Sequence, residues 1–293
     1  MTNRFDHVSI VMPARNEEAG LSELLPQLAT LYPGAELIVV DDGSSDSTPT
    51  IAKKHSARII RHPYPKGNGA AVKTGARASS REIVVFMDAD GQHRPEDVLR
   101  LLDKFGEGYD MVVGARGRSG QASLGRWFAN SLYNRLSSWM VNHRIQDLTS
   151  GFRAVRRKAF LEFLHMLPNG FSYPTTITMA FFRAGHSVAY VPVDVHERSG
   201  KSHIKPLRDG ARFFLVIFRV GTLYSPLKVF IPISLGFFVL GVGYYLYTYI
   251  LHSRFTNMSA LLLSTSVIIG LIGLVSEQIT NLLYTSQHPN DKE

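Results

Sequence analysis

Two aspartates in the segment VVFMDADGQH are the strongest candidates for chemistry in the sequence. A hydrophobic strand is expected to end at Met87, so Asp88 and Asp90 follow at its carboxyl end, where ligand sites form in open α/β sheets. Gly91 and the amide of Gln92 come next. These groups offer only hard oxygen ligands, which suit Mg²⁺ or Mn²⁺ with phosphate oxygens completing the coordination. An Asp-x-Asp pair is also common in ordinary turns, and its placement after a buried strand is what favours the metal.

A second acidic strand end lies in the segment LIVVDDGSSDST. Asp41 and Asp42 close the expected strand, and a turn beginning at Gly43 leads into a helix. Carboxylates at such positions accept hydrogen bonds from the ribose in other nucleotide-binding folds. Ser44 and Asp46 are better explained as caps of the following helix, because both residue types are preferred at that position. Capping does not account for Asp41 and Asp42.

Polar residues also follow two further strands. The segment VMPARNEE places Pro13, Asn16 and Glu17 at the start of a helix, and HPYPKGNGAA forms a turn. In that turn Gly67 and Gly69 would let backbone amides approach a ligand. Neither GxGxxG nor GxxxxGK occurs, which argues against a dinucleotide fold and a P-loop ATPase. Four histidines show no ligand spacing and are expected on the surface or in loops: His55, His62, His93 and His203.

The elements that must position these residues can be predicted from the hydrophobic pattern. Short runs rich in Val and Ile alternate with segments of helical period, which is typical of an α/β fold with a mainly parallel, Rossmann-like sheet. The expected strands are 8–12, 36–40, 58–60, 83–87, 111–114 and 188–193. The expected helices are 17–31, 47–55, 69–79, 95–105 and 123–141.

The composition restricts the cellular setting. The net charge of +8 lies entirely before residue 228, and this basic character suits nucleic acid, an anionic membrane surface or phosphorylated substrates equally well. The absence of cysteine excludes disulfides and thiolate metal sites. The N-terminal segment has no long apolar run, so we predict no secretory signal and a domain that stays in the cytosol.

Two apolar stretches near the C-terminus, 227–251 and 258–284, are each long enough to cross a bilayer. The connector 252–257 is short, so we expect a transmembrane hairpin whose ends face the same side, with the basic domain in the cytoplasm. Buried core helices are the alternative. Glu277 is expected deep in the second span, where a carboxylate is normally paired or neutral.

The segment before the hairpin, IKPLRDGARFFLVIFRVGTLY, mixes basic and aromatic residues. This composition favours an amphipathic helix at the membrane interface, and an ordinary helix of the soluble domain is the alternative. The expected domains are therefore an α/β domain at 1–203, interface helices at 204–226, the hairpin at 227–284 and a cytoplasmic tail at 285–293.

Several motifs taken together resemble one family. PARNEE, VVDDGSSDST, KGNGAA, FMDADGQH, VVGAR and DLTSGFR, in this order and spacing, look like the family-two inverting glycosyltransferases of GT-A fold. With two C-terminal spans, the chain most resembles the polyprenyl-phosphate glycosyltransferases, which include dolichol-phosphate mannose synthases and undecaprenyl-phosphate glucosyltransferases. The resemblance covers the whole chain.

The resemblance implies roles for individual residues. It implies metal ligation by Asp88, Asp90 and Gln92. The residues implied to line the nucleotide sugar are Pro13, Glu17, Asp41, Asp42, Lys66, Asp88, Ala89 and Asp90. Arg116 and Arg126 would hold the acceptor phosphate, which a guanidinium fork matches well, although either could be a solvated surface charge.

Further implied residues lie later in the chain. Asp147 in DLTSGFR matches the family's active-site aspartate, above a floor shaped by Ser150, Gly151 and Arg153. The segment ERSGKS resembles a mobile basic loop that closes over the phosphates with Arg198, Lys201 and Ser202.

The implied reaction is the inverting transfer of a hexosyl group from a nucleotide sugar, a UDP-sugar or GDP-mannose, to a polyprenyl phosphate. A lipid monophosphate that resembles a protein phosphomonoester has a second pKa of about 6 and needs no strong base near neutrality. We therefore expect Asp147 to orient acceptor groups or arginines, although the family usually assigns it as the base.

The partners expected on this basis are the nucleotide sugar, the polyprenyl phosphate, membrane lipid and further copies of the chain, with a tetramer possible and no nucleic acid. The expected location is the inner cell membrane. A processive polysaccharide synthase is a rival, but its QxxRW element is missing, because Gln121 and Arg126 are too far apart and precede Asp147. A non-catalytic membrane protein that retains the fold is a second rival.

Overall fold

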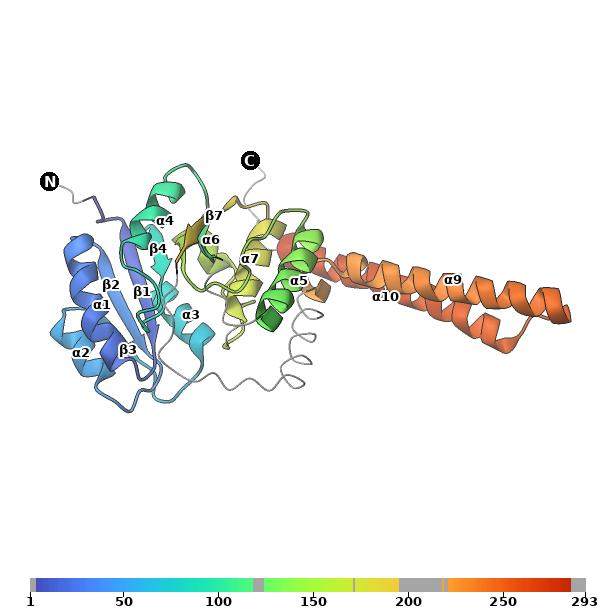
Figure 1. Cartoon of the computed structure of the whole chain (residues 1–293), viewed down its shortest axis with the longest axis horizontal. Coiled ribbons are helices and arrows are strands. Elements are labelled where there is room, and N and C mark those ends of the chain that lie inside the picture. The colour runs from blue at the N-terminus through green and yellow to red at the C-terminus, as the bar shows by residue number, and fades with distance from the viewer. Residues whose placement is uncertain (1–3, 118–123, 171, 195–217, 219–220, 286–293) are drawn as a thin grey trace. The chain divides into compact units, whose positions relative to one another are not determined.

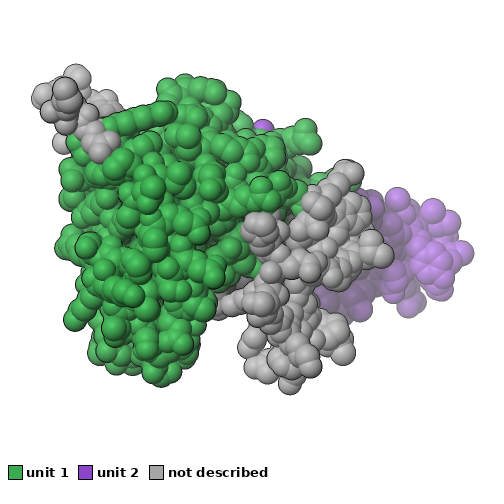
Figure 2. Space-filling view, turned by 60° about the vertical axis from the view of Figure 1, so that its left-hand side comes forward, with its two compact units in different colours: residues 1–139, 143–203 green, residues 140–142, 204–293 purple. Residues whose placement is uncertain are grey.

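The computed structural model of the chain describes residues 4–117, 124–170, 172–194, 218 and 221–285, without the side chains of 124–130 and 283–285. Residue contacts divide the chain into two units, coloured separately in Figure 2. The first comprises Met1–Trp139 and His143–His203, and the second Met140–Asn142 and Ile204–Glu293. Most of the expected interface-helix segment 204–226 lies outside the described residues, so it stays a prediction, as do the domain boundaries.

The first unit is built on a seven-stranded sheet with the order β3-β2-β1-β4-β6-β5-β7 (Figure 1). All neighbouring strands are parallel except β6, which runs antiparallel to both β4 and β5. The expected mainly parallel sheet is thus confirmed, while β6 was not expected from the sequence. The strands are β1 Val8–Ala14, β2 Glu36–Asp41, β3 Arg58–Arg61, β4 Ile83–Phe86, β5 Met111–Arg116, β6 Arg153–Arg156 and β7 Val188–Val193.

Helices cover both faces of this sheet. The helices of the first unit are α1 Glu18–Leu31, α2 Thr48–Lys54, α3 Asn68–Ala78, α4 Asp97–Phe105, α5 Leu124–Val141, α6 Arg157–Glu162 and α7 Tyr173–Arg183. Four buried leucines of α1, at helical spacing, pack with Ile10 and Met12 of β1 and with Leu101 of α4. Val11 points to the opposite face, because side chains alternate along a strand, and there Gly75 lets α3 approach it closely.

The second unit contains the two long helices, α9 Pro226–His252 and α10 Asn257–Thr285, which lie side by side (Figure 1). Both are long and apolar enough to cross a membrane. Their contact includes paired serines, because the hydroxyls of Ser234 and Ser266 each donate to the other residue's carbonyl, at 2.8 and 2.9 Å. Such interhelical hydrogen bonds suit a pair of helices in lipid. The predicted hairpin is confirmed as a candidate for membrane spans.

Polar contacts gather at the beginning of α9. The backbone N–H of Leu227 donates to the carboxylate of Glu277 at 3.4 Å, so Glu277 lies level with the first turn of α9. Within the hairpin this carboxylate lies at the level where α9 begins, and its depth in a bilayer stays a prediction. A carboxylate near a helix N-terminus is favourable because unpaired N–H groups converge there.

Candidate active site

The strand ends that carry the predicted residues lie at one edge of the sheet. Pairing in register places Ala14 of β1 beside Asp41 of β2, and Val11 of β1 beside Phe86 of β4. Asp88 and Asp90 follow β4 directly. The prediction that acidic and polar residues follow several neighbouring strands is thus met by the geometry, because parallel strands share their carboxyl edge.

Helix α1 packs closely against the segment from Asp88 to Asp90. Ala89 is buried, and a Cβ on Gly20 of α1 would overlap its carbonyl oxygen. Both aspartates are partly exposed, and the backbone N–H of Gln92 donates to Asp90 Oδ1 at 3.1 Å. In the described part of the chain no three or more acidic, histidine or cysteine residues gather into a metal cluster. A cation here would rest on two carboxylates with neutral or substrate oxygens, which suits Mg²⁺ or Mn²⁺.

Arg116 and Asp147, assigned to catalysis on the basis of resemblance, contact each other. Arg116 ends β5, and its Nε and Nη2 donate to the two carboxylate oxygens of Asp147 at 2.7 and 3.0 Å. Nη2 also donates to the Thr149 hydroxyl. Bidentate pairing of this kind fixes both groups. The Nη1 nitrogen makes no hydrogen bond to the described residues, and about a third of the Arg116 side chain is exposed.

The pair is stabilised in its charged form. Burial alone would raise the pKa of Asp147, but hydrogen bonds and the charge of Arg116 outweigh it and hold this pKa below its ordinary value. Burial would likewise lower the pKa of Arg116, but Asp147 and then Asp88 raise it above the ordinary value. Backbone N–H groups of Thr149 and Ser150 also donate to Asp147 Oδ1. Asp147 is therefore an ionised acceptor in the free protein.

A buried arginine forms the floor below this pair. Arg153, the first residue of β6, is fully buried and donates to the carbonyl of Ser150 and to the hydroxyl of Thr178 at 3.1 Å. Burial lowers its pKa. The neighbouring Gly151 lies beside Asp88, because a Cβ there would lie 3.4 Å from Asp88 Oδ2 and 3.1 Å from the Tyr173 hydroxyl. The structure thus brings Asp88, Asp147 and the floor residues together.

The acidic end of β2 has a different environment. Asp42 is buried, and its carboxylate accepts hydrogen bonds from the backbone N–H groups of Lys66 and Gly67, both at 2.8 Å. It also contacts His62 Nδ1 at 2.7 Å. Asp41 accepts from the backbone N–H of Ser44 and forms an ion pair with Arg61 at 3.0 Å. Both carboxylates therefore hold the loops at this edge of the sheet, and a nucleotide site there stays a prediction.

The glycines of KGNG also differ from the expected role. Gly67, at φ +104°, and Gly69 pack against the backbone of residues 168–170, where a Cβ on either glycine would overlap a carbonyl oxygen. The Gly67 amide points at Asp42 rather than at an open site. Close approach between two protein segments is thus why glycine is required here.

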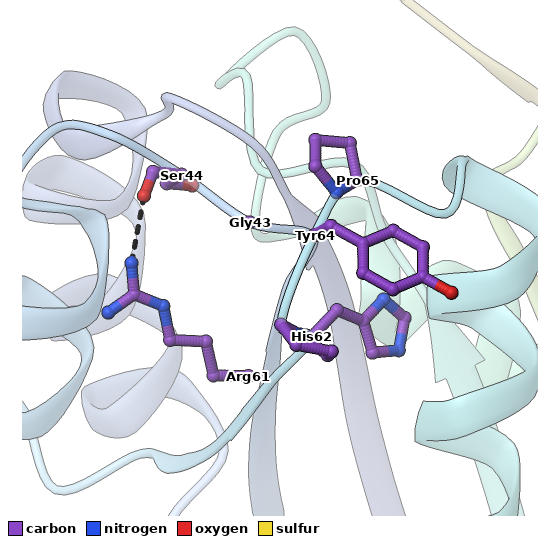
Figure 3. A pocket seen from close by; sticks show the side chains of 7 residues that line it. Gly43, Ser44, Arg61, His62, Tyr64 and Pro65 are labelled. Carbon is purple, nitrogen blue, oxygen red and sulfur yellow. Dashed lines mark hydrogen bonds between the residues drawn. The ribbon is translucent and has the colours of Figure 1, made fainter.

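An open pocket of about 590 Å³ lies beside these loops (Figure 3). Arg61 lies along one side of it, where Nη2 donates to the carbonyl of Ser44 at 2.9 Å, and the Tyr64 ring lies on another. Lys66 is exposed just beyond, with its ammonium 5.6 Å from the centre of the Tyr64 ring. The lining residues are Gly43, Ser44, Arg61, His62, Pro63, Tyr64 and Pro65.

The remaining predicted nucleotide residues lie at the end of β1. Pro13 is in β1, and Glu17 directly precedes α1, where its N–H donates to the Thr48 hydroxyl at 3.0 Å. Asn16, at φ +56°, accepts from the backbone N–H of Ser45 at 2.9 Å. These contacts join the turns that follow β1 and β2.

Two of the histidines expected in loops or on the surface lie outside the helices and the sheet strands, as loop residues would, but are buried. His62 is 5% exposed and links Asp42 to the hydroxyl of Thr74 at 2.9 Å. His93 is 6% exposed and stacks on Phe152 with ring centres 4.6 Å apart, and burial lowers its pKa to about 4. His62 directly follows strand β3, and this position could have indicated that its ring helps to hold the loop.

Several predicted residues lie outside the described side chains. Arg126 is in α5, but its side chain is not among those described. The predicted basic loop containing Arg198, Lys201 and Ser202 lies outside the described residues. Their roles stay predictions.

Comparison with known proteins shows the family. The glycosyl transferase family 2 profile matches residues 9–164, and the profile of the GtrB C-terminal hairpin matches residues 225–282. A dolichyl-phosphate hexose transferase from Haloferax volcanii is 33% identical over 209 residues, which cover 71% of this chain and 90% of the relative. A polyprenol monophosphomannose synthase from Mycolicibacterium smegmatis is 28% identical over 205 residues, covering 64% and 77%.

A solved structure shares the fold. Glucosyl-3-phosphoglycerate synthase from Mycobacterium tuberculosis, in complex with Mn²⁺, UDP and glucosyl-3-phosphoglycerate, matches with a TM-score of 0.57 and 25% identity. The match covers 73% of this chain and 77% of that one. The chain therefore belongs to glycosyl transferase family 2 and is a glycosyltransferase of GT-A fold with a GtrB-type C-terminal hairpin.

Proposed function

We propose that this glycosyltransferase moves a hexosyl group from a nucleotide sugar to a polyprenyl phosphate at a membrane surface. Relatives named as a dolichyl-phosphate hexose transferase and a polyprenol monophosphomannose synthase support the lipid acceptor. The apolar hairpin supports it independently, because a lipid substrate must be met at the bilayer. The basic charge before the hairpin suits both the anionic surface and the phosphates.

The observation that carries the proposal is the Arg116–Asp147 pair beside Asp88. Asp147 holds Arg116 by Nε and Nη2, so Nη1 remains for an incoming phosphate. The acceptor phosphate is itself an anion near neutrality and attacks without losing a decisive proton. In this account Asp147 orients Arg116 and remains ionised, consistent with its lowered pKa.

Asp88, Asp90 and Gln92 would hold a divalent cation, Mg²⁺ or Mn²⁺. When bound, such an ion supplies positive charge that stabilises the departing nucleoside diphosphate. Mn²⁺ and UDP occur together in the structural neighbour, which supports a divalent ion and favours a UDP-sugar, with GDP-mannose as the alternative donor. Attack opposite the leaving group inverts the anomeric carbon, so an α-linked donor gives a β-linked lipid phosphosugar.

The nucleotide would lie along the ends of β1 and β2, near Pro13, Glu17 and the loop that Asp42 organises. Lys66 is exposed there and can reach phosphate oxygens. We place the catalytic unit on the cytoplasmic side of the inner membrane, spanned twice by the hairpin, with subunits associating as oligomers. Arg126, Arg198, Lys201 and Ser202 are proposed to hold the acceptor and the diphosphate.

The test uses the full-length protein in lipid nanodiscs. It is incubated with Mn²⁺, undecaprenyl phosphate and a panel of nucleotide sugars, and lipid products are identified by mass spectrometry. We expect a lipid phosphosugar with one donor class and loss of product in Asp90→Ala. No product with any donor, or equal turnover by Asp90→Ala, would contradict the proposal.

A further inference from the structure

The side-chain amide of Asn134 contacts the backbone on both sides of Asp147. Asn134 lies in α5, and its Nδ2 donates to the carbonyl of Gln146 at 2.8 Å. Its Oδ1 accepts from the backbone N–H of Leu148 at 3.2 Å. One planar group therefore fixes the peptide units that precede and follow the aspartate.

We propose that Asn134 is a positioning residue that sets the orientation of Asp147 and, through it, of Arg116. The inference rests on the proposed function, in which Arg116 holds the acceptor phosphate. One hydrogen bond before Asp147 and one after it restrict the backbone rotations that would turn its carboxylate. Asparagine suits this role because its short amide carries a donor and an acceptor together.

Two other hydrogen bonds hold the same loop but do not involve the residues on either side of Asp147. The Ser138 hydroxyl accepts from the backbone N–H of Ile145 at 2.9 Å, and Arg153 donates to the carbonyl of Ser150. Neither group contacts Gln146 or Leu148. Loss of the Asn134 amide should therefore loosen the direction of the carboxylate while the loop stays in place.

A graded set of variants tests this. Asn134→Ala removes both hydrogen bonds, and Asn134→Asp removes the donor but keeps an acceptor for Leu148. Ser138→Ala is the matched control, since it weakens the same loop two residues before Asp147. The full-length enzyme in nanodiscs is assayed with undecaprenyl phosphate and the donor found above, with KM and kcat measured separately for each substrate.

We expect kcat/KM for the lipid acceptor to fall about tenfold in Asn134→Ala, as for two hydrogen bonds between uncharged groups, and less in Asn134→Asp. The donor KM and the melting temperature should stay close to the unmodified protein, and Ser138→Ala should change acceptor kinetics by less than about twofold. Unchanged acceptor kinetics in Asn134→Ala would overturn the inference. Equal losses for both substrates with a lowered melting temperature would do so too, because they indicate a purely structural role.

Arg116→Lys separates this inference from the proposed function. If Arg116→Lys weakens acceptor use while Asn134→Ala does not, only the role of Asn134 is wrong. If Arg116→Lys leaves acceptor kinetics unchanged, the acceptor site itself has been wrongly assigned.

Discussion

Two acidic strand ends in the same sheet edge differ in what their carboxylates contact. At the end of β2, Asp42 is buried and accepts from two backbone N–H groups and His62. After β4, Asp88 and Asp90 remain partly exposed, and Asp88 lies beside Gly151. The aspartates at the end of β2 thus hold loops, whereas those after β4 stay partly accessible to solvent. Burial of the carboxylate, not its strand-end position, separates the two ends.

The largest expected effect concerns the β4 end. Asp90→Ala should lower transferase activity by about 10³-fold, because it removes a proposed cation ligand at the place where charge would develop on the leaving group. Its free energy of unfolding should change little, since Asp90 is partly exposed. Activity assays and chemical unfolding of the same preparation check both points. A strongly destabilised Asp90→Ala protein would show that the aspartates at the ends of β2 and β4 do not differ in their contribution to stability.

The reverse pattern is expected for the β2 end. Asp42→Ala leaves buried donors of Lys66, Gly67 and His62 without their acceptor, which should cost about 3 kcal/mol in the free energy of unfolding. The measurement is urea unfolding followed by circular dichroism, with Asp90→Ala as the comparison. Full stability in Asp42→Ala would show that its hydrogen bonds do not hold the loop.

A third prediction concerns Gly20 of α1, which packs against Ala89 between the two aspartates that follow β4. Gly20→Ala places a Cβ against the carbonyl of Ala89, so the adjoining aspartates must shift. We expect about a tenfold loss in kcat/KM for the donor, in the range of overpacking effects. Gly170→Ala is the control, because a Cβ there meets nothing within 4 Å. Equal effects of the two substitutions would argue against displacement of Ala89.

The smallest expected effect is a pH dependence of stability. Burial would raise the pKa of Asp42, but hydrogen bonds from His62, Lys66 and Gly67 outweigh it and lower this pKa below the ordinary 3.8. The stabilisation is therefore fully present above about pH 5 and is lost as the pH falls through the lowered pKa of the folded state. Unfolding measured from pH 6 to 3 should show a shallower decline in Asp42→Asn. An identical slope in both proteins would contradict the assignment.

Much of the fold follows from the sequence because the parallel strands are short apolar runs with helices between them. β6 was missed because its four residues begin and end with arginine and show no apolar run. Helix α7 was missed as well, since its threonines favour strands over helices. Both elements are needed to bury Arg153, whose donors reach Pro174 and Thr178 of α7.

The placement of Asp88 and Asp90 was predictable because both residues directly follow an apolar strand. Contacts between distant residues could not be predicted. Arg116 and Asp147 are 31 positions apart, and nothing in the local sequence indicates that they meet. The burial of His62 and the close packing of Gly67 likewise depend on segments brought together only in the folded chain.

Direct titration of Mn²⁺ tests whether Asp88 and Asp90 hold the cation. The full-length protein with UDP is titrated and free Mn²⁺ is followed by electron paramagnetic resonance, alongside Asp90→Ala and Gly170→Ala. We expect one bound Mn²⁺ in the unmodified protein and in Gly170→Ala, and none in Asp90→Ala. Undiminished Mn²⁺ binding in a folded Asp90→Ala protein would contradict it.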